Sequence, residues 1–131
     1  DREIVDVLKR VRNQFGVNRI AQVGALVSLA DTDFVASVVD AVSKGREQLR
    51  QVAGRLGLNC LASATNFVNI DVGGGVRARQ ILARLIETDV FVRMPASSPG
   101  DRCIRVTVGR PSDHEIFAAA LAEALARSDQ P

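Results

Sequence analysis

The sequence of 131 residues indicates an α+β protein in which helices come first and a two-layer sandwich follows. Over residues 1–56, apolar side chains recur every three or four positions, which is the period of an α-helix. Beyond Gly57 the pattern changes to short apolar runs bounded by Gly, Pro and Asn, which is typical of strands. The order strand, helix, strand, strand, helix in the second half favours a small sheet whose helices cover one face.

Three helices are expected before the sheet. The first occupies residues 1–12. The second occupies residues 19–30 and is apolar nearly all round, so we expect it to be buried on most sides. The third follows the cap cluster Asp31-Thr32-Asp33, covers residues 32–56 and stops at Gly57. A helix of that length can bridge two domains, because each residue adds about 1.5 Å.

The second half is expected to hold the sheet and two covering helices. Strands are predicted at residues 66–72, 90–92 and 103–108, and helices at residues 76–87 and 111–127. Residues 58–61 are a short candidate strand before them. The triple glycine at residues 73–75 reads as a turn. Only a short loop joins the last two strands, so we expect them to form an antiparallel hairpin.

Composition and charge exclude several classes of partner. The hydrophobic fraction of 47% is enough for a real core, and with five Phe and no Trp or Tyr that core is aliphatic. The lack of Trp and Tyr argues against a base-stacking nucleic-acid surface. No apolar run reaches the roughly 18 residues that span a bilayer, and the charged start is unlike a signal peptide, so we expect a cytoplasmic chain. Two cysteines, Cys60 and Cys103, do not make a disulfide framework.

Two arginines are the strongest candidates for a binding site. Arg105 lies mid-strand and points away from the apolar face of that strand. Arg93 ends the preceding predicted strand, so a hairpin would bring the two side chains together. The pattern leaves two alternatives open. Both side chains face solvent, or both converge on one carboxylate or phosphate, for which arginine is well suited.

No other pattern indicates a complete active site. The only lysines, Lys9 and Lys44, lie on polar stretches of helices, unlike the desolvated lysines that form Schiff bases. His114 lacks the neighbouring ligands of a metal site, and we expect a surface or partly buried side chain. The residues alone therefore indicate at most half of an anion-binding site, with no catalytic and no metal-binding residue.

Five short motifs, in order along the chain, resemble those of the histidinol-phosphate aminotransferases. They are Val11 to Asn18 (similar to R-N-P-F-N-V-N), Ala21 to Asp31 (A-Q-x-A-A…A-L-x-D), Ser63 to Phe67 (S-x-A/T-N-F), Val90 to Arg93 (G-V-x-V-R) and Ile104 to Gly109 (L-R-I/V-T-V-G). Gln14, Gly16 and the Thr88-Asp89 pair depart from the commoner residues. The resemblance implies the small C-terminal domain of fold type I aminotransferases, which depend on pyridoxal phosphate.

The resemblance also implies an organisation and a set of roles. Residues 1–31 would be a helical segment from the end of the large cofactor domain, residues 32–56 the connecting interdomain helix, and residues 57–131 the small C-terminal α+β domain. Arg105, Arg93 and Asn18 would bind substrate. The Schiff-base lysine would lie upstream of Asp1, so the fragment alone would be inactive. The parent would be a homodimer that acts on a small-molecule amino donor, histidinol phosphate or a related or aromatic amino acid, and a 2-oxo acid.

Two alternatives stay open. The chain is instead a stand-alone α+β module that binds a small anionic ligand or a protein partner, or its parent is a related decarboxylase that shares these motifs. A fragment should expose apolar helix surface or self-associate, whereas a module should be a monomer with a polar surface.

Overall fold

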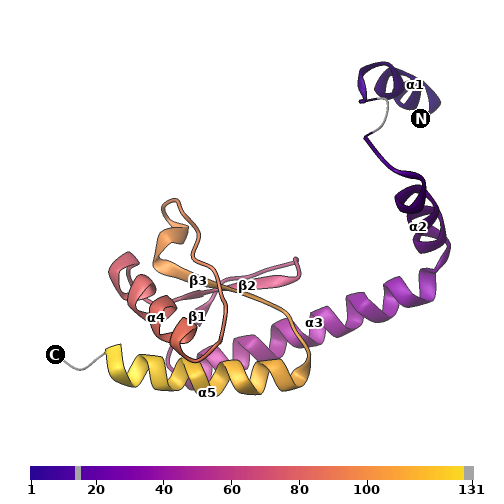
Figure 1. Ribbon diagram of the computed structural model, residues 1–131. Helices are drawn as coiled ribbons and strands as arrows, with labels where there is room; N and C mark the ends of the chain where they lie inside the picture. Colours follow the sequence, from indigo (N-terminus) through magenta and orange to yellow (C-terminus); the bar gives the residue numbers. More distant parts are fainter. Residues whose placement is uncertain (14–15, 129–131) are drawn as a thin grey trace. The chain divides into compact units, whose positions relative to one another are not determined.

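The computed structural model describes residues 1–13 and 16–128 and divides into two compact units, Asp1–Val38 and Val39–Pro131. Gln14 and Phe15, part of the first motif, lie outside the described residues. The elements in chain order (Figure 1) are α1 (Arg2–Val11), α2 (Arg19–Ala30), α3 (Thr32–Arg55), β1 (Asn59–Cys60), β2 (Phe67–Asp71), α4 (Gly75–Glu87), the 3₁₀ turn η1 (Gly100–Arg102), β3 (Cys103–Thr107) and α5 (Pro111–Ser128).

Side-chain caps account for the starts of the first three helices. The carboxylate of Asp1 accepts from the Glu3 N–H at 2.9 Å, and the amide oxygen of Asn18 accepts from the Ala21 N–H at 2.8 Å. Asp31 accepts from the backbone N–H of Phe34 at 3.0 Å, at the start of α3. Each cap satisfies a donor that the first turn of a helix leaves unpaired.

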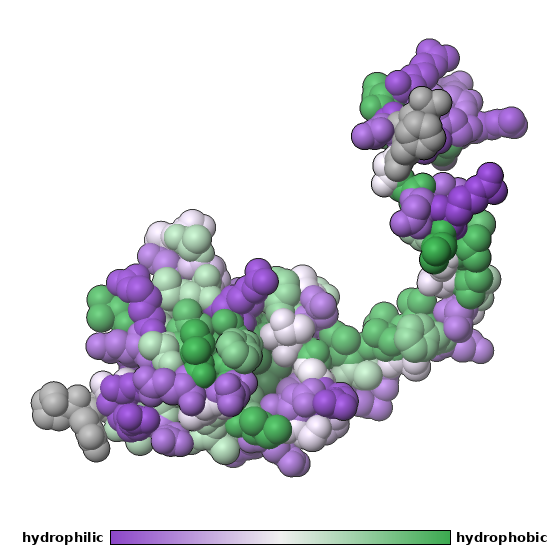
Figure 2. Space-filling model, in the orientation of Figure 1, coloured by the Kyte–Doolittle hydropathy of each residue, from purple (hydrophilic) through white to green (hydrophobic). Residues whose placement is uncertain are grey.

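The helices of the first unit expose apolar side chains. Neither α1 nor α2 contains a buried residue. Ile20 and Leu29 of α2 are 86% and 79% exposed, and Phe34 at the start of α3 is 64% exposed. In Figure 2, green apolar surface gathers along α2 and the first half of α3. The burial expected for α2 is therefore not found among the described residues, where this helix exposes apolar side chains.

The second unit is built around a three-stranded antiparallel sheet in the order β1-β2-β3. Its register places Val68 opposite Val106 and Ile70 opposite Ile104. These four side chains share one face and pack into a single core with the second half of α3, α4 and α5. The helices contribute Leu49, Val52, Ala53, Ala78, Ile81, Leu85, Phe117, Leu121, Ala124 and Leu125. The two-layer α+β architecture predicted from the sequence is confirmed.

One predicted strand is absent. Residues 90–92 are not a strand, and their segment pairs with β3 only through a single antiparallel bridge between Arg93 and Arg105. The reason lies in how α4 ends. Asp89 adopts a positive φ of 58°, in the region that favours glycine, and the Val90 N–H donates back to the Leu85 carbonyl at 2.9 Å. Val90 is thus held at the end of α4 by a hydrogen bond, so this segment pairs with β3 only at Arg93.

Cys60 and Cys103 are both free, and Cys103 is buried. Burial raises the pKa of both thiols. None of the described helices has the length and apolarity needed to cross a membrane.

Candidate functional site

The arginine pair lies where β3 meets the segment before the 94–101 loop. The Arg93 N–H donates to the Arg105 carbonyl at 3.1 Å, and the Arg105 N–H donates to the Arg93 carbonyl at 2.6 Å. Residues that exchange both backbone hydrogen bonds lie directly opposite each other and project from the same face of a sheet. The structure therefore brings Arg93 and Arg105 together, on the face turned away from the core.

An aromatic ring contacts one of the two guanidiniums. The Cζ atom of Arg105 lies over the ring of Phe67, 4.9 Å from its centroid. Asn69 lies directly opposite Arg105 in the register, so Phe67 occupies the diagonal position on the same face. Phe67, Asn69 and Arg105 are all half-buried, whereas Arg93 is exposed.

Neither guanidinium of the pair has an acceptor among the described residues. No hydrogen bond or ion pair in this part of the chain involves the side chain of Arg93 or of Arg105. The acidic residue of β2, Asp71, is engaged elsewhere, because it accepts from Arg102 Nε at 2.9 Å and from the Gly73 N–H at 2.8 Å. The hydrogen bond from Arg102 lowers the pKa of Asp71. Two like charges thus lie on the same face without a counter-charge from residues 1–13 and 16–128.

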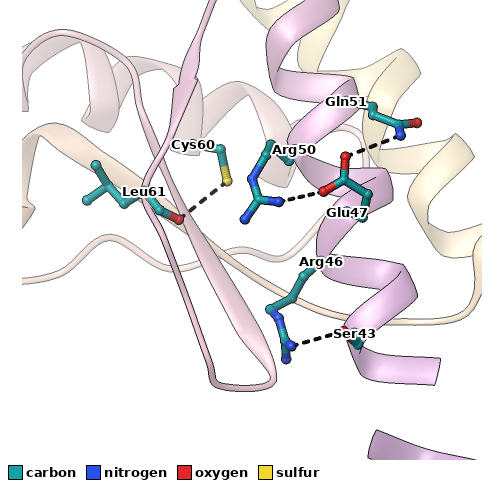
Figure 3. A network of polar contacts seen from close by, with 7 residues as sticks. All are labelled: Ser43, Arg46, Glu47, Arg50, Gln51, Cys60 and Leu61. Carbon is teal, nitrogen blue, oxygen red and sulfur yellow. Dashed lines mark hydrogen bonds and ion pairs between the residues drawn. The ribbon is translucent and has the colours of Figure 1, made fainter. Parts of the chain in front are cut away.

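Two arginines of α3, Arg46 and Arg50, differ in this respect, because their guanidiniums have partners. On α3, Arg46 donates to the Thr65 carbonyl at 2.8 Å and to the Ser43 hydroxyl at 3.3 Å, while Arg50 pairs with Glu47. Figure 3 shows Arg46 beside Ser43, and Arg50 between Glu47 and Cys60. These side chains tie α3 to the loop before β2 or balance local charge, so we interpret them as structural.

Asn18 belongs to the first unit. Its amide oxygen caps α2 through the Ala21 N–H, so the described role of this side chain is local. A part in substrate binding stays a prediction.

His114 is buried and fully hydrogen-bonded. It is 6% exposed, its Nδ1 lies 2.9 Å from Gln48 Oε1, and its Nε2 accepts from the Gly109 N–H at 3.2 Å. Desolvation lowers the pKa of the imidazole. Both ring nitrogens are used, which gives His114 a structural role. Among residues 1–13 and 16–128, no group of His, Cys, Asp and Glu side chains has the arrangement of a metal site.

The two lysines do not fit a covalent cofactor site. Lys9 pairs with Asp6 at 3.0 Å and Lys44 with Asp40 at 2.7 Å, and their side chains are 63% and 73% exposed. A lysine that forms a Schiff base needs a desolvated or otherwise depressed amine. Both amines are instead solvated and paired with carboxylates.

The chain belongs to a known enzyme family. The family model for class I and II aminotransferases matches residues 1–121, which is most of the chain. The family membership indicated by the five motifs is thereby confirmed.

Within that family, the chain is similar to histidinol-phosphate aminotransferases. It is 37% identical over 124 residues to "Histidinol-phosphate aminotransferase 1" of Cupriavidus pinatubonensis, covering 94% of this chain and 33% of that protein. Histidinol-phosphate aminotransferase from Sinorhizobium meliloti, solved in complex with pyridoxal-5'-phosphate, superposes with a TM-score of 0.87 at 36% identity, covering 92% of this chain and 34% of that one. A decarboxylase from Sulfurospirillum multivorans, with a TM-score of 0.67 and 20% identity over 95% of this chain and 36% of that one, shares the fold alone. The chain spans about a third of the length of the curated relatives it matches.

Phe67 is the residue at this site that sequence reasoning missed. Its motif, Ser63 to Phe67, was noted only as part of the resemblance. Period-two alternation places Phe67 and Asn69 on one strand face, but the contact with Arg105 depends on the register between β2 and β3, which no local pattern specifies.

Proposed function

We propose that this chain is part of a pyridoxal-phosphate-dependent aminotransferase in which Arg105 and Arg93 hold the anionic group of the substrate. The observation that carries the proposal is the pair of guanidiniums on one sheet face with no acceptor among the described residues. Like charges directly opposite each other on neighbouring strands are unfavourable. A bound carboxylate or phosphate removes that penalty through charge-assisted hydrogen bonds.

The amino donor that we favour is histidinol phosphate or a related amino compound. The reason is the similarity to histidinol-phosphate aminotransferases over nearly the whole of this chain. The acceptor would be a 2-oxo acid, whose carboxylate suits the same arginines. A related decarboxylase is the less favoured alternative, because that likeness rests on fold alone.

The cofactor would supply the electron sink for amino-group transfer. The residues of this chain would bind and orient the substrate's anionic end. Because Lys9 and Lys44 are both exposed and paired, the lysine that carries the cofactor would lie in a part of the parent outside this sequence. The chain on its own would then be inactive.

The proposal includes the organisation implied by the resemblance. Residues 1–31 would come from the end of the cofactor domain, residues 32–56 would connect the domains, and residues 57–131 would form the small domain. Asn18 would contribute to the substrate entrance from the first of these segments. The parent would be a cytoplasmic homodimer.

The test is an Arg105→Gln substitution in the full-length parent. This change removes the charge but keeps a polar side chain of moderate length. A hydrogen bond to a charged group contributes about 1.5–3 kcal/mol, so the KM for histidinol phosphate should rise by about ten- to a hundredfold. The visible absorption of bound pyridoxal phosphate should be unchanged.

The matched control is Arg127→Gln, because the pairs that Arg127 forms within the described residues, with Glu87 of α4 and Glu123 of α5, are exposed. It should leave KM as in the wild type. An Arg105→Gln enzyme that loses its cofactor but keeps its affinity for the donor would contradict the proposed role.

A further inference from the structure

Phe67 contacts Arg105, one of the two arginines whose like charges repel each other across the strands. Arg93 and Arg105 occupy directly opposed positions, and their side chains have no counter-charge within the described residues. The Phe67 ring, 4.9 Å from Arg105 Cζ, is the one cation–π contact found in this part of the chain. The electron-rich face of an aromatic ring attracts a guanidinium without neutralising its charge. The ring can therefore stabilise Arg105 while leaving that charge available to a ligand.

We propose that Phe67 is a positioning residue that holds the Arg105 guanidinium in the orientation that binds the substrate's carboxylate or phosphate; this inference rests on the proposed function. A guanidinium that contacts a ring through its face keeps the N–H donors at its edge free. Those edge donors are the ones that form paired hydrogen bonds to carboxylate or phosphate oxygens. Holding one guanidinium in place also limits the loss of side-chain freedom on binding.

The backbone that carries the ring is held by a hydrogen-bonded turn before β2. The Ser63 hydroxyl donates to the Phe67 carbonyl at 2.6 Å, and the Thr65 hydroxyl accepts from the Phe67 N–H at 3.4 Å. The Thr65 carbonyl in turn accepts from Arg46 of α3 at 2.8 Å. The S-x-T-N-F segment is thus anchored to the long helix at one end and presents its aromatic ring to Arg105 at the other.

The register fixes the other side of the contact. Phe67 pairs with Thr107, and Asn69 pairs with Arg105, so the ring and the guanidinium are diagonal neighbours on one face. Diagonal neighbours of this kind are within reach of aromatic and long side chains. Phe67 and Arg105 are both half-buried, so the contact is partly shielded from water and should be stronger than at an open surface.

The experiment compares Phe67→Leu with Phe67→Tyr in the full-length parent, loaded with pyridoxal phosphate. Leucine keeps an apolar side chain but removes the ring, and tyrosine keeps the ring. Phe67→Leu should raise the KM for histidinol phosphate, and the inhibition constant of inorganic phosphate, by about two- to thirtyfold. The value of kcat and the cofactor absorption should stay as in the wild type. Phe67→Tyr should retain wild-type values of all four quantities.

A core substitution separates positioning from general destabilisation. Phe117→Leu removes a buried ring from α5, on the opposite side of the sheet from Arg105. It should lower the melting temperature without changing the inhibition constant of phosphate. If Phe67→Leu changes only the melting temperature, as Phe117→Leu does, the positioning role is wrong.

A double-mutant cycle separates this inference from the proposed function. In an Arg105→Gln background, Phe67→Leu should produce no further rise in KM, because its effect passes through Arg105. Additive effects would overturn the positioning role while leaving the proposed function in place. If Arg105→Gln itself leaves KM and phosphate inhibition unchanged, the proposed function fails first, and the role of Phe67 fails with it.

Discussion

At the scale of the residue, the hydrogen bonds of His114 define its charge state. The Gly109 N–H can only donate, so Nε2 must be the unprotonated ring nitrogen, and Nδ1 carries the proton that goes to Gln48 Oε1. Protonation of Nε2 would place its N–H against the Gly109 N–H, and the hydrogen bond between them would be lost. Desolvation of the buried ring adds to this effect and lowers the pKa of His114.

A pH-dependent stability follows from that lowered pKa. Because the unfolded chain has the ordinary pKa of 6.5 and the folded chain a lower one, the unfolded state binds more protons between the two values. The free energy of unfolding contributed by His114 is therefore fully present above pH 6.5 and falls as the pH drops below it. The slope should be at most about 1.4 kcal/mol per pH unit, since one proton is involved.

His114 is the only histidine in the sequence, which makes the measurement direct. The imidazole proton resonances should titrate with a pKa below 6.5 in the folded chain. Denaturant unfolding at a series of pH values should show the matching loss of stability, and a His114→Gln variant should lose that part of the pH dependence. A folded pKa at or above 6.5 would contradict the neutral ring.

Some of the site was predictable from single residues and some was not. Alternation along β3 correctly placed Arg105 away from the core, because Ile104 and Val106 on either side are buried. The pairing with Arg93 was also predictable, because a short loop joins the two segments. The Phe67 contact was not, because it requires a register between strands that are far apart in sequence.

At the scale of the element, α3 offers a matched pair of glycines. Gly45 is buried, and a Cβ there would clash with Val108 Cγ1 and approach His114 Cε1 to 3.1 Å. Gly54 is exposed and has no heavy atom within 4 Å of the same position. Both glycines lie inside the helix, so both carry the same intrinsic disadvantage of about 1 kcal/mol relative to alanine.

The two alanine substitutions should therefore have opposite signs. Gly54→Ala should raise the free energy of unfolding by about 0.5–1 kcal/mol. Gly45→Ala should lower it by about 1–3 kcal/mol, because the added methyl group overpacks the contact between α3 and the chain that links β3 to α5. Denaturant titration of both variants measures the difference. Equal stabilisation by both substitutions would show that α3 packs less tightly against Val108 and His114 than the contacts indicate.

Local signals predicted the helices better than the strands. The helix at residues 19–30 was predicted to the residue from its apolar pattern. The helix α3 begins at its predicted start, because Asp31, in the predicted cap cluster, caps it. Residues 90–92 have the same apolar pattern as a strand. They are not one because the positive φ of Asp89 and the backbone bond to Leu85 hold their start at the end of α4. Whether this segment forms a strand or stays at the helix end depends on tertiary geometry rather than on its composition.

At the scale of the whole molecule, the two units differ in how they bury apolar surface. The second unit has one continuous core, whereas α1 and α2 have no buried residue in the described chain. Contiguous apolar surface on this scale is uncommon in monomeric proteins and marks a surface that is normally covered. In our proposal, the rest of the parent protein covers this surface. The parent would be about three times as long as this chain, as its relatives are.

The exposed apolar surface predicts that the isolated chain associates with itself. Expressed alone, the 131 residues should self-associate, and sedimentation velocity should show a mass that increases with protein concentration. Replacing the two most exposed large apolar residues of α2, by Ile20→Lys and Leu29→Lys, should shift the distribution toward monomer. The control is the pair Gln22→Lys and Ser28→Lys, which adds comparable positive charge to exposed polar positions of the same helix.

If that control dissociates the chain equally well, charge repulsion rather than apolar burial drives the change. A wild-type chain that stays monomeric at every concentration would instead favour the stand-alone module, because its apolar helices would then tolerate water without a partner.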